Sequence, residues 1–413
     1  MLDPIQNQAL RICLNAFRTS PKDSLHVEAN EQPLHIRRTK MSMQYALKLY
    51  SNKLNPTFEI VFNYPLIDRY QLHPNSIQPF GLRIKPELEQ AGINLEYIAD
   101  YKVPNTPPWR LITPTILKSM IIGSKQEIPP IIYLSIFYEI SEEYKDYLHF
   151  YTDGSKKEAA TSAALVTESN VFRCRLTDNA SIFSAEARAL QMALNAIRIN
   201  NRNKFVIFTD SRSVLESLEH KRVDNPMILD LLETYQELVD NGKEIVFCWV
   251  PSHVDIKGNE KADRAAKEAL ELIPSDILLP HTDLKTLVNC HNNLLWQEAW
   301  NDANGNKLQM VQPFVGKKMI TYSPSRRDDM VMHRARIGHT HITHCYLLKG
   351  EPPPECIACQ SRLTVKHILL DCVDFQPTRD QYYSVRTLKE LFDKVDSEKI
   401  INYLKAIDLH NKF

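Results

Sequence analysis

Between residues 145 and 275 the chain alternates short β-prone segments with longer helical ones, and this order constrains the fold more than any other feature. Apolar runs rich in β-branched and aromatic residues predict strands, and apolar residues at helical spacing predict amphipathic helices. The order is three strands, a helix, a strand, two helices, a strand and a last helix. It predicts an α/β fold with a mixed five-stranded sheet and helices on both faces. The predicted strands are Leu148–Thr152, Ala163–Val166, Val171–Leu176, Phe205–Thr209 and Ile245–Val250, and the predicted helices are Ser184–Ile199, Ser211–Leu218, Pro226–Val239 and Gly258–Leu270.

The segments before this region are predicted to be helical and then extended. Residues 1–102 contain apolar residues at helical spacing in Gln6–Phe17 and Ile36–Leu54, which predicts a helical N-terminal segment. A turn into a short strand is predicted over Leu54–Tyr64. Residues 103–144 hold a series of prolines, which predicts a stiff, extended connector.

The segments after residue 275 are predicted to form a linker and a small module. Residues 276–319 are interpreted as linker and one helix. Residues 320–413 are rich in His, Arg and Cys and are interpreted as a C-terminal Cys/His module, with helix over Thr387–Leu409.

The overall charge and hydropathy restrict where such a chain is expected to work. Lys plus Arg equals Asp plus Glu at 50 each, so the net charge is zero. A neutral chain does not indicate a polyanionic partner by itself, but a local basic face is sufficient to bind one. The N-terminus lacks the pattern of a secretory signal, and apolar runs such as Pro129–Ile140 are too short to span a bilayer. We therefore expect an intracellular protein of the cytoplasm or nucleus, neither secreted nor bound to a membrane.

Two carboxylates are predicted to meet at one edge of the sheet. Asp153 follows the first predicted strand and Asp210 follows the fourth. Side chains at the C-terminal ends of adjacent strands in an open sheet share one crevice. Two acids there repel each other unless a cation lies between them. An Asp after a strand on its own indicates no more than a turn.

Two further carboxylates occupy helix faces that should be buried. Glu186 lies on an otherwise apolar stripe of its helix, and Asp263 shares a stripe with Ala266 and Leu270. Burying an unpaired carboxylate is costly, so each residue needs a metal, a base or a proton, unless it extends to solvent from the helix boundary. The apolar members of the Glu186 stripe are Phe183, Leu190, Ala193 and Ile197.

Four carboxylates from two strands and two helices form a hard, oxygen-only ligand set. Such a set is typical of Mg²⁺ or Mn²⁺ rather than zinc. Two such ions about 4 Å apart can stabilise the attacking and the leaving oxygen of an in-line phosphodiester displacement. The joint pattern is therefore more informative than any one of its acids.

The same region resembles the ribonuclease H family, in the form found in non-LTR retrotransposons of the insect type. The matching stretches are Tyr151-Thr152-Asp153-Gly154-Ser155, Phe183-Ser184-Ala185-Glu186-Ala187, Phe208-Thr209-Asp210-Ser211, Trp249-Val250-Pro251-Ser252-His253 and Gly258-Asn259-Glu260-Lys261-Ala262-Asp263. The resemblance implies a two-metal endonuclease that cuts the RNA strand of RNA·DNA hybrids.

The resemblance also implies a role for each matched residue. Asp153, Glu186, Asp210 and Asp263 would bind the two ions, and His253 would assist proton transfer or product release. Substrate contacts would come from residues beside these ligands, with Glu186 or the backbone near Gly154 probing the RNA 2′-hydroxyl. The expected substrate-binding residues are Gly154, Ser155, Ser211 and Asn259. One departure is Arg212, where cellular members often have glutamine.

The flanking residues resemble the same mobile elements. Residues 1–65 are similar to the segment that follows the polymerase palm, and no Tyr-x-Asp-Asp polymerase motif is present. The chain is therefore expected to be the C-terminal part of a longer reverse transcriptase polyprotein whose polymerase part would be its partner. Two alternatives stay open: a catalytically silent nucleic-acid-binding remnant, and a strand-transfer enzyme, which the fourth acid disfavours.

A cluster of cysteines and one histidine predicts a second metal site. Cys356, Cys359, His367 and Cys372 supply three thiolates and an imidazole, a suitable tetrahedral Zn²⁺ set. The alternative is that these residues are unligated. The seven residues between Cys359 and His367 exceed the spacing of a retroviral zinc knuckle. A structural zinc ion is favoured over a direct nucleic-acid contact, and Arg334 and Arg336 are expected to add positive charge nearby.

Overall fold

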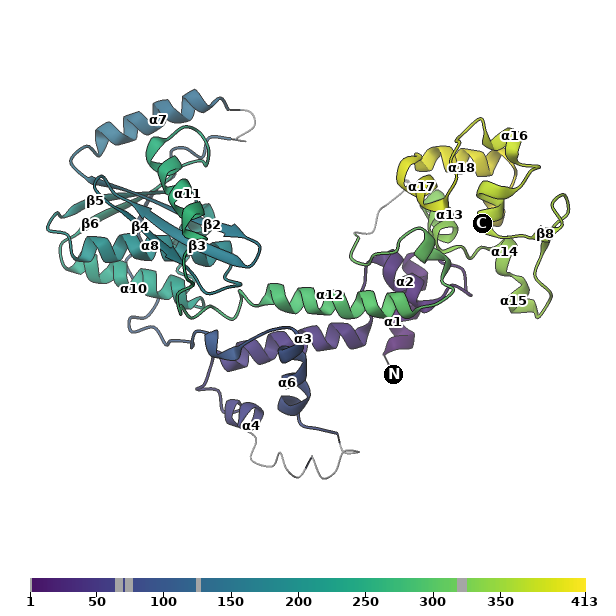
Figure 1. Cartoon of the computed structure of the whole chain (residues 1–413), viewed down its shortest axis with the longest axis horizontal. Coiled ribbons are helices and arrows are strands. Elements are labelled where there is room, and N and C mark those ends of the chain that lie inside the picture. The colour runs from purple at the N-terminus through teal and green to yellow at the C-terminus, as the bar shows by residue number, and fades with distance from the viewer. Residues whose placement is uncertain (1, 64–69, 71–76, 124–127, 318–324) are drawn as a thin grey trace. The chain divides into compact units, whose positions relative to one another are not determined.

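The computed structural model describes residues 2–63, 70, 77–123, 128–317 and 325–413, and it divides into two compact units (Figure 1). One unit contains residues 42–288, and the other combines residues 1–41 with residues 289–413. In the part of the chain that the structure describes, none of the helices combines the length and hydrophobicity needed to traverse a lipid bilayer.

A mixed sheet of six strands forms the centre of the first unit. Its order is β1-β6-β5-β2-β3-β4, with parallel pairing from β1 to β2 and antiparallel pairing from β2 to β4. The strands are β1 (Thr115–Leu117), β2 (Leu148–Lys157), β3 (Ala160–Val166), β4 (Val171–Arg175), β5 (Lys204–Thr209) and β6 (Glu244–Trp249).

Helices cover both faces of this sheet because its central strands are apolar on both faces. In β5, Phe205 and Ile207 pack with one set of helices, and Val206 and Phe208 pack on the opposite face. The first face carries α8, α9 and α10, and the second carries α7 and α11 (Figure 1). Their bounds are α7 (Pro130–Glu143), α8 (Ile182–Arg198), α9 (Arg212–Glu219), α10 (Pro226–Asp240) and α11 (Lys257–Ala269).

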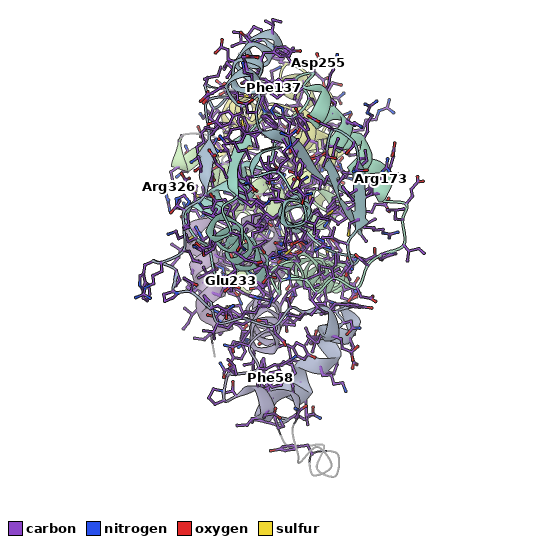
Figure 2. The ribbon with its side chains drawn as sticks, turned by 90° about the vertical axis from the view of Figure 1, so that its left-hand side faces the viewer. Phe58, Phe137, Arg173, Glu233, Asp255 and Arg326 are labelled. Atoms are coloured by element: carbon purple, nitrogen blue, oxygen red, sulfur yellow. The ribbon has the colours of Figure 1, made fainter. Side chains whose placement is uncertain are left out.

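The α/β fold is confirmed, and the proline-rich segment corrects the predicted number of strands. Residues 103–144 are not extended throughout, because they form β1, the sixth strand, and α7. Pro130 begins α7, a position at which proline needs no hydrogen-bond donor. Tyr133 and Phe137, one helical turn apart, then pack into the core beneath the helix, where Phe137 (labelled in Figure 2) contacts Phe208 edge-on.

The N-terminal part of this unit, up to η1, is helical. The segment predicted as a turn and strand over Leu54–Tyr64 is instead helical at α4, because Phe58 and Phe62 pack against the ring of Tyr50 of α3, Phe62 edge-on. Tyr64 itself lies outside the described residues. The bounds are α3 (Leu34–Tyr50), α4 (Phe58–Phe62), α6 (Phe80–Gln90) and η1 (Leu95–Tyr97).

The second unit is a helical module with a short hairpin. Its core includes Trp296 and Trp300, both almost fully buried. The predicted helix over Thr387–Leu409 is broken into α17 and α18, which Asp396 separates by capping the second helix. The elements are α1 (Asp3–Cys13), α2 (Lys22–Ala29), α12 (Lys285–Asp302), η2 (Lys307–Met310), α13 (Arg326–Ile337), α14 (His341–His344), α15 (Tyr346–Lys349), β7 (Glu355–Cys356), β8 (Ser361–Arg362), η3 (His367–Asp371), α16 (Gln376–Arg379), α17 (Leu388–Lys394), α18 (Ser397–Ala406) and η4 (His410–Lys412).

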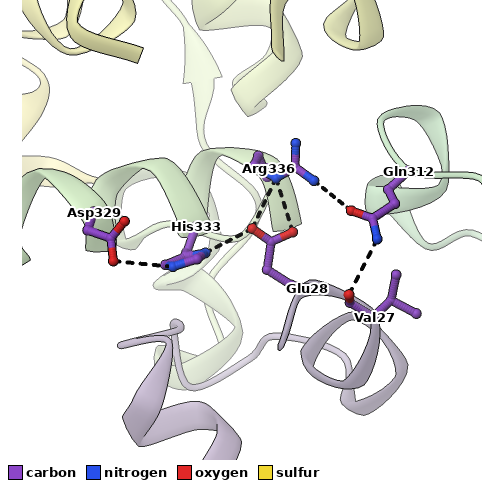
Figure 3. A network of polar contacts seen from close by, with 6 residues as sticks. All are labelled: Val27, Glu28, Gln312, Asp329, His333 and Arg336. Carbon is purple, nitrogen blue, oxygen red and sulfur yellow. Dashed lines mark hydrogen bonds and ion pairs between the residues drawn. The ribbon is translucent and has the colours of Figure 1, made fainter. Parts of the chain in front are cut away.

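A buried ion-pair network joins the two sequence segments of this unit (Figure 3). The carboxylate of Glu28 on α2 accepts hydrogen bonds from Arg336 Nε at 3.0 Å and lies 2.8 Å from His333 Nδ1. Arg336 also donates to Gln312, whose amide donates to the carbonyl of Val27. The Arg336 guanidinium is therefore buried, with its charge paired by the Glu28 carboxylate.

Arg334, on the same helix, hydrogen-bonds to backbone carbonyl groups. It donates to the carbonyls of Asn15 and Phe413. The prediction that Arg336 adds positive charge near the cluster is wrong, because its guanidinium is paired with Glu28 in the interior. The same statement about Arg334 stays a prediction.

Replacing Glu28 with glutamine should destabilise this unit strongly. The Arg336 guanidinium would keep its charge in the interior without a counter-charge, and loss of one partner of a buried pair costs about 3–5 kcal/mol. Urea unfolding followed by tryptophan fluorescence measures the change. The control is Glu31→Gln, which removes an exposed ion pair with Arg37 and should cost less than about 1 kcal/mol. Equal losses in the two variants would contradict the role given to Glu28.

Candidate functional site

Asp153 and Asp210 lie where two adjacent parallel strands stop pairing. β2 and β5 pair up to Thr152 and Thr209, and each acid is the next residue. The sequence predicted that the strand ends before Asp153. In the structure β2 continues to Lys157, because the residues after Thr152 pair with β3. The backbone of Asp210 is anchored by the side chain of Trp249, whose Nε1 donates a hydrogen bond to the Asp210 carbonyl at 3.1 Å.

Glu186 reaches the same place from helix α8. Ser181 caps this helix by accepting a hydrogen bond from the Ser184 N–H. The helix lies very close to β2 at Gly154, where an added Cβ would be 3.0 Å from both the Ala185 Cβ and the Glu186 nitrogen. The glycine therefore permits the approach that brings Glu186 beside Asp153.

These three acids form one cluster of oxygen atoms. Each of Asp153, Glu186 and Asp210 offers a carboxylate oxygen within 4.8 Å of the others. Asp153 and Glu186 are buried, at 5% and 8% exposure, and the Oε2 atom of Glu186 has no hydrogen-bond partner. A buried acceptor without a donor is costly, so this oxygen is suited to bind a cation.

Burial and mutual repulsion disfavour the charged form of all three acids. Burial, reinforced by Asp210 and Asp263, raises the pKa of Asp153 to about 8. Burial and the charges of Asp153 and Asp210 raise the pKa of Glu186 well above its ordinary value. The pKa of Asp210 is also raised, mainly by burial. The cluster therefore requires protons or a metal ion at neutral pH.

Asp263 lies beside this cluster and belongs to a second one. It is close enough for its charge to raise the pKa of both Asp153 and Asp210. Its ligand atoms fall within 4.8 Å of His253 and Glu260, and its Oδ2 is 2.7 Å from Lys267 Nζ. The sequence prediction did not include Glu260 or Lys267, although both share helix α11 with Asp263, and Lys267 follows it at the i+4 spacing of helical ion pairs.

His253 is exposed on a loop that is anchored on both sides. Val250, Val254 and Ile256 are buried in the core under α7. His253 itself adopts a left-handed conformation with φ of 52° and keeps 63% of its side chain exposed. Its Nδ1 lies 3.8 Å from Glu260, and its charge acts on Asp210.

The expected substrate-binding residues differ in accessibility. Gly154 and Ser155 on β2 are partly exposed. Ser211 and Asn259 are buried, and each carries a side-chain oxygen without a hydrogen-bond partner. The Asn259 side chain hydrogen-bonds Asp210 and lowers its pKa, against the effect of burial.

The four Cys/His residues come together in the other unit. Cys356 ends β7, Cys359 lies in the following turn, and His367 and Cys372 lie at the two ends of η3. The sulfur atoms of Cys356 and Cys359 are 3.8 and 3.9 Å from that of Cys372. All four ligand atoms lie within 4.8 Å of one another.

The chemistry of this cluster fits a zinc ion. Tetrahedral Zn–S bonds of about 2.3 Å place two sulfurs about 3.8 Å apart, close to the spacings seen here. The cysteines are free thiols, and the buried Nε2 atom of His367 has no hydrogen-bond partner. The backbone N–H of Cys359 contributes most to lowering the pKa of the Cys356 thiol to about 7, which favours the thiolate that a metal binds.

Known proteins resemble part of this chain. The Pol polyproteins of equine infectious anemia virus, strain Wyoming and isolate 1369, are 30% identical to it over 176 residues, covering 36% of this chain and 15% of each polyprotein. The chain thus corresponds to a small part of their length. The crystal structure of RNase H1 from the halophilic archaeon Halobacterium salinarum NRC-1 aligns at 24% identity with a TM-score of 0.26, covering 30% of this chain and 98% of that one.

A family profile matches the region that carries the acidic cluster. The profile, described as RNase H, covers residues 145–271. These residues run from β2 to α11 and include Asp153, Glu186, Asp210 and Asp263. Residues 145–271 are therefore a domain of the ribonuclease H family, hydrolases that act on the RNA in RNA·DNA hybrids.

Proposed function

We propose that this domain is an active endonuclease that cuts the RNA strand of RNA·DNA hybrids with two divalent metal ions. The observation that carries the proposal is the cluster of Asp153, Glu186 and Asp210, whose oxygens converge although burial raises the pKa of each residue. Asp263 lies next to it as a fourth acid. A catalytically silent remnant would have no need to hold these acids together against their repulsion. The catalytic function is therefore favoured over the silent remnant.

The donor set suits hard cations. It consists of carboxylate oxygens, which Mg²⁺ and Mn²⁺ prefer over sulfur or nitrogen ligands. Two such ions would supply the positive charge that an in-line phosphodiester displacement needs at its attacking and leaving oxygens. Asp153, Glu186 and Asp210 would hold one ion, and Asp263 would complete the ligands of the second together with the shared acids.

The residues around the acids would orient the hybrid and move protons. His253, exposed beside Glu260 and close to Asp210, would carry a proton to or from the reacting phosphate. Gly154 and Ser155 are accessible on β2 and would contact the RNA strand. Ser211 and Asn259 are buried, so they would not lie on the nucleic acid surface, and Asn259 would act through its hydrogen bond to Asp210.

We also propose that the chain belongs to a retrotransposon polyprotein and works beside a polymerase part. The motif resemblance to non-LTR, insect-type elements and the similarity to Pol polyproteins support this proposal. The Cys/His cluster of the other unit would hold one structural Zn²⁺ ion, as the sulfur spacings and the unpartnered His367 nitrogen support.

Replacing Asp210 with asparagine should abolish cleavage. A labelled RNA·DNA hybrid, an RNA duplex and a DNA duplex are each incubated with the protein and Mg²⁺. The unmodified protein should cut only the RNA of the hybrid, and the variant should be slower by about 10²-fold or more, as when an electrostatic stabiliser is lost. Asp255→Asn is the control, because Asp255 is an exposed loop residue in a left-handed conformation that asparagine also adopts (Figure 2). Cleavage that persists in the Asp210 variant would contradict the proposal.

Metal-free protein should lose stability as the pH rises. A carboxyl group whose pKa is raised in the folded state contributes its stability at pH values below its unfolded pKa, and that contribution is lost as the pH rises through about 8. Calorimetry in chelator should therefore show a larger fall in Tm between about pH 5.5 and 8.5 than in the Asp153→Asn variant. Mg²⁺ should remove the difference in the unmodified protein. Parallel pH curves in the two proteins would contradict the assignment.

Replacing Cys359 with serine should lower the zinc content. Purified protein should carry about one Zn²⁺ ion per chain, and loss of one of four ligands should reduce this clearly. Metal analysis by mass spectrometry gives the content. Cys345→Ser serves as the control, since Cys345 is half-buried in the same unit and outside the cluster. A zinc content that is unaffected in the Cys359 variant counts against the site.

A further inference from the structure

Helix α11 carries a cation directly on the fourth acid of the active site. Lys267 lies one turn after Asp263, and its Nζ is 2.7 Å from Asp263 Oδ2. The charge of this ammonium also reaches Asp153 in the acidic cluster. Lys267 therefore neutralises part of the negative charge that would attract a divalent ion.

The two partners of this pair are exposed to different degrees. The Lys267 side chain is 57% exposed, whereas the Asp263 side chain is 17% exposed. Exposed ion pairs of this kind are weak, and the lysine stem is flexible. The ammonium can thus leave Asp263 for water without breaking any other hydrogen bond that the described residues show.

The orientation of Asp263 agrees with its engagement by Lys267. Its oxygens group with His253 and Glu260, and the trio of Asp153, Glu186 and Asp210 forms a separate set. The trio is therefore already assembled as a ligand set, while the fourth acid is paired with the ammonium group of Lys267. A metal ion at the trio would displace no cation, whereas a metal ion at Asp263 would have to displace Lys267.

We propose that Lys267 competes with the second divalent ion for Asp263 and so sets the metal concentration at which the second ion binds. The inference rests on the proposed two-metal function of the domain. Lys267 is a positioning residue: it holds the Asp263 carboxylate near the cluster when the second ion is absent and yields it when that ion binds. The first ion, at the trio, is affected much less.

The test measures Mn²⁺ binding to the full chain without nucleic acid. Isothermal titration and electron paramagnetic resonance should show a tighter and a weaker ion at the acidic site. In Lys267→Gln the weaker ion should bind about two- to fivefold more tightly, the range that corresponds to an exposed ion pair. Lys267→Arg should resemble the unmodified protein. Asp263→Asn should lose the weaker ion, which identifies it.

Lys261→Gln is the matched control. Lys261 is exposed on the same helix, and its replacement by glutamine changes the net charge by the same amount. It stands about 200° around the helix from Asp263, so it does not share a face with that acid. It should leave both affinities unchanged. Equal tightening in both variants, or no tightening in Lys267→Gln, overturns the inference.

Hybrid cleavage separates this inference from the proposed function. In Lys267→Gln the Mg²⁺ concentration for half-maximal rate should fall about two- to fivefold, with the rate at saturating Mg²⁺ unchanged. A lower saturating rate with an unchanged midpoint would indicate a merely structural role and overturn the inference. If the unmodified chain cuts no substrate while Lys267→Gln still tightens Mn²⁺ binding, the proposed function fails and the competition for Asp263 stands.

Discussion

Repulsion among buried carboxylates is the constraint on which the active-site region depends. Asp153, Glu186 and Asp210 come from two strands and a helix, and each is held where its charge is unfavourable. The surrounding packing maintains the arrangement: β2 and β5 pair up to the two aspartates, and Gly154 lets α8 approach. Stability gained in the apolar core on both faces of the sheet offsets the electrostatic cost, as is usual at functional sites.

Much of the sheet and of the acidic site could be predicted from local sequence patterns. Five strands were predicted because buried strands are short apolar runs, and the acids were recognised because carboxylates interrupt apolar stripes. The extent of β2 beyond Asp153 was not predictable in this way, since its second half, Gly154–Lys157, contains no apolar residue and is recognised as strand only by its pairing with β3. Lys267 and Glu260 were missed because charged residues on a helix surface are common, and only their distances to Asp263 and His253 distinguish them.

Long-range pairing explains what the sequence pattern could not provide. Glu28 and His333 are 305 positions apart in the chain, and nothing in the local spacing of either residue indicates the other. Residues 1–41 thus complete the core of a module that the sequence suggested to be C-terminal alone. The assembled ion pair also explains why Arg336 of α13 is unavailable to nucleic acid.

Strand β1 has a consequence for how the domain is isolated. It pairs in parallel with β6 through Thr115–Leu117, and these residues lie before the 145–271 region that the family profile covers. A fragment that begins at residue 145 would leave the β6 backbone unpaired along one side and would remove α7 from the apolar surface that includes Val246 and Cys248. Uncovered strand edges recruit other chains, so self-association of such a fragment would reflect the missing cover and not a native assembly.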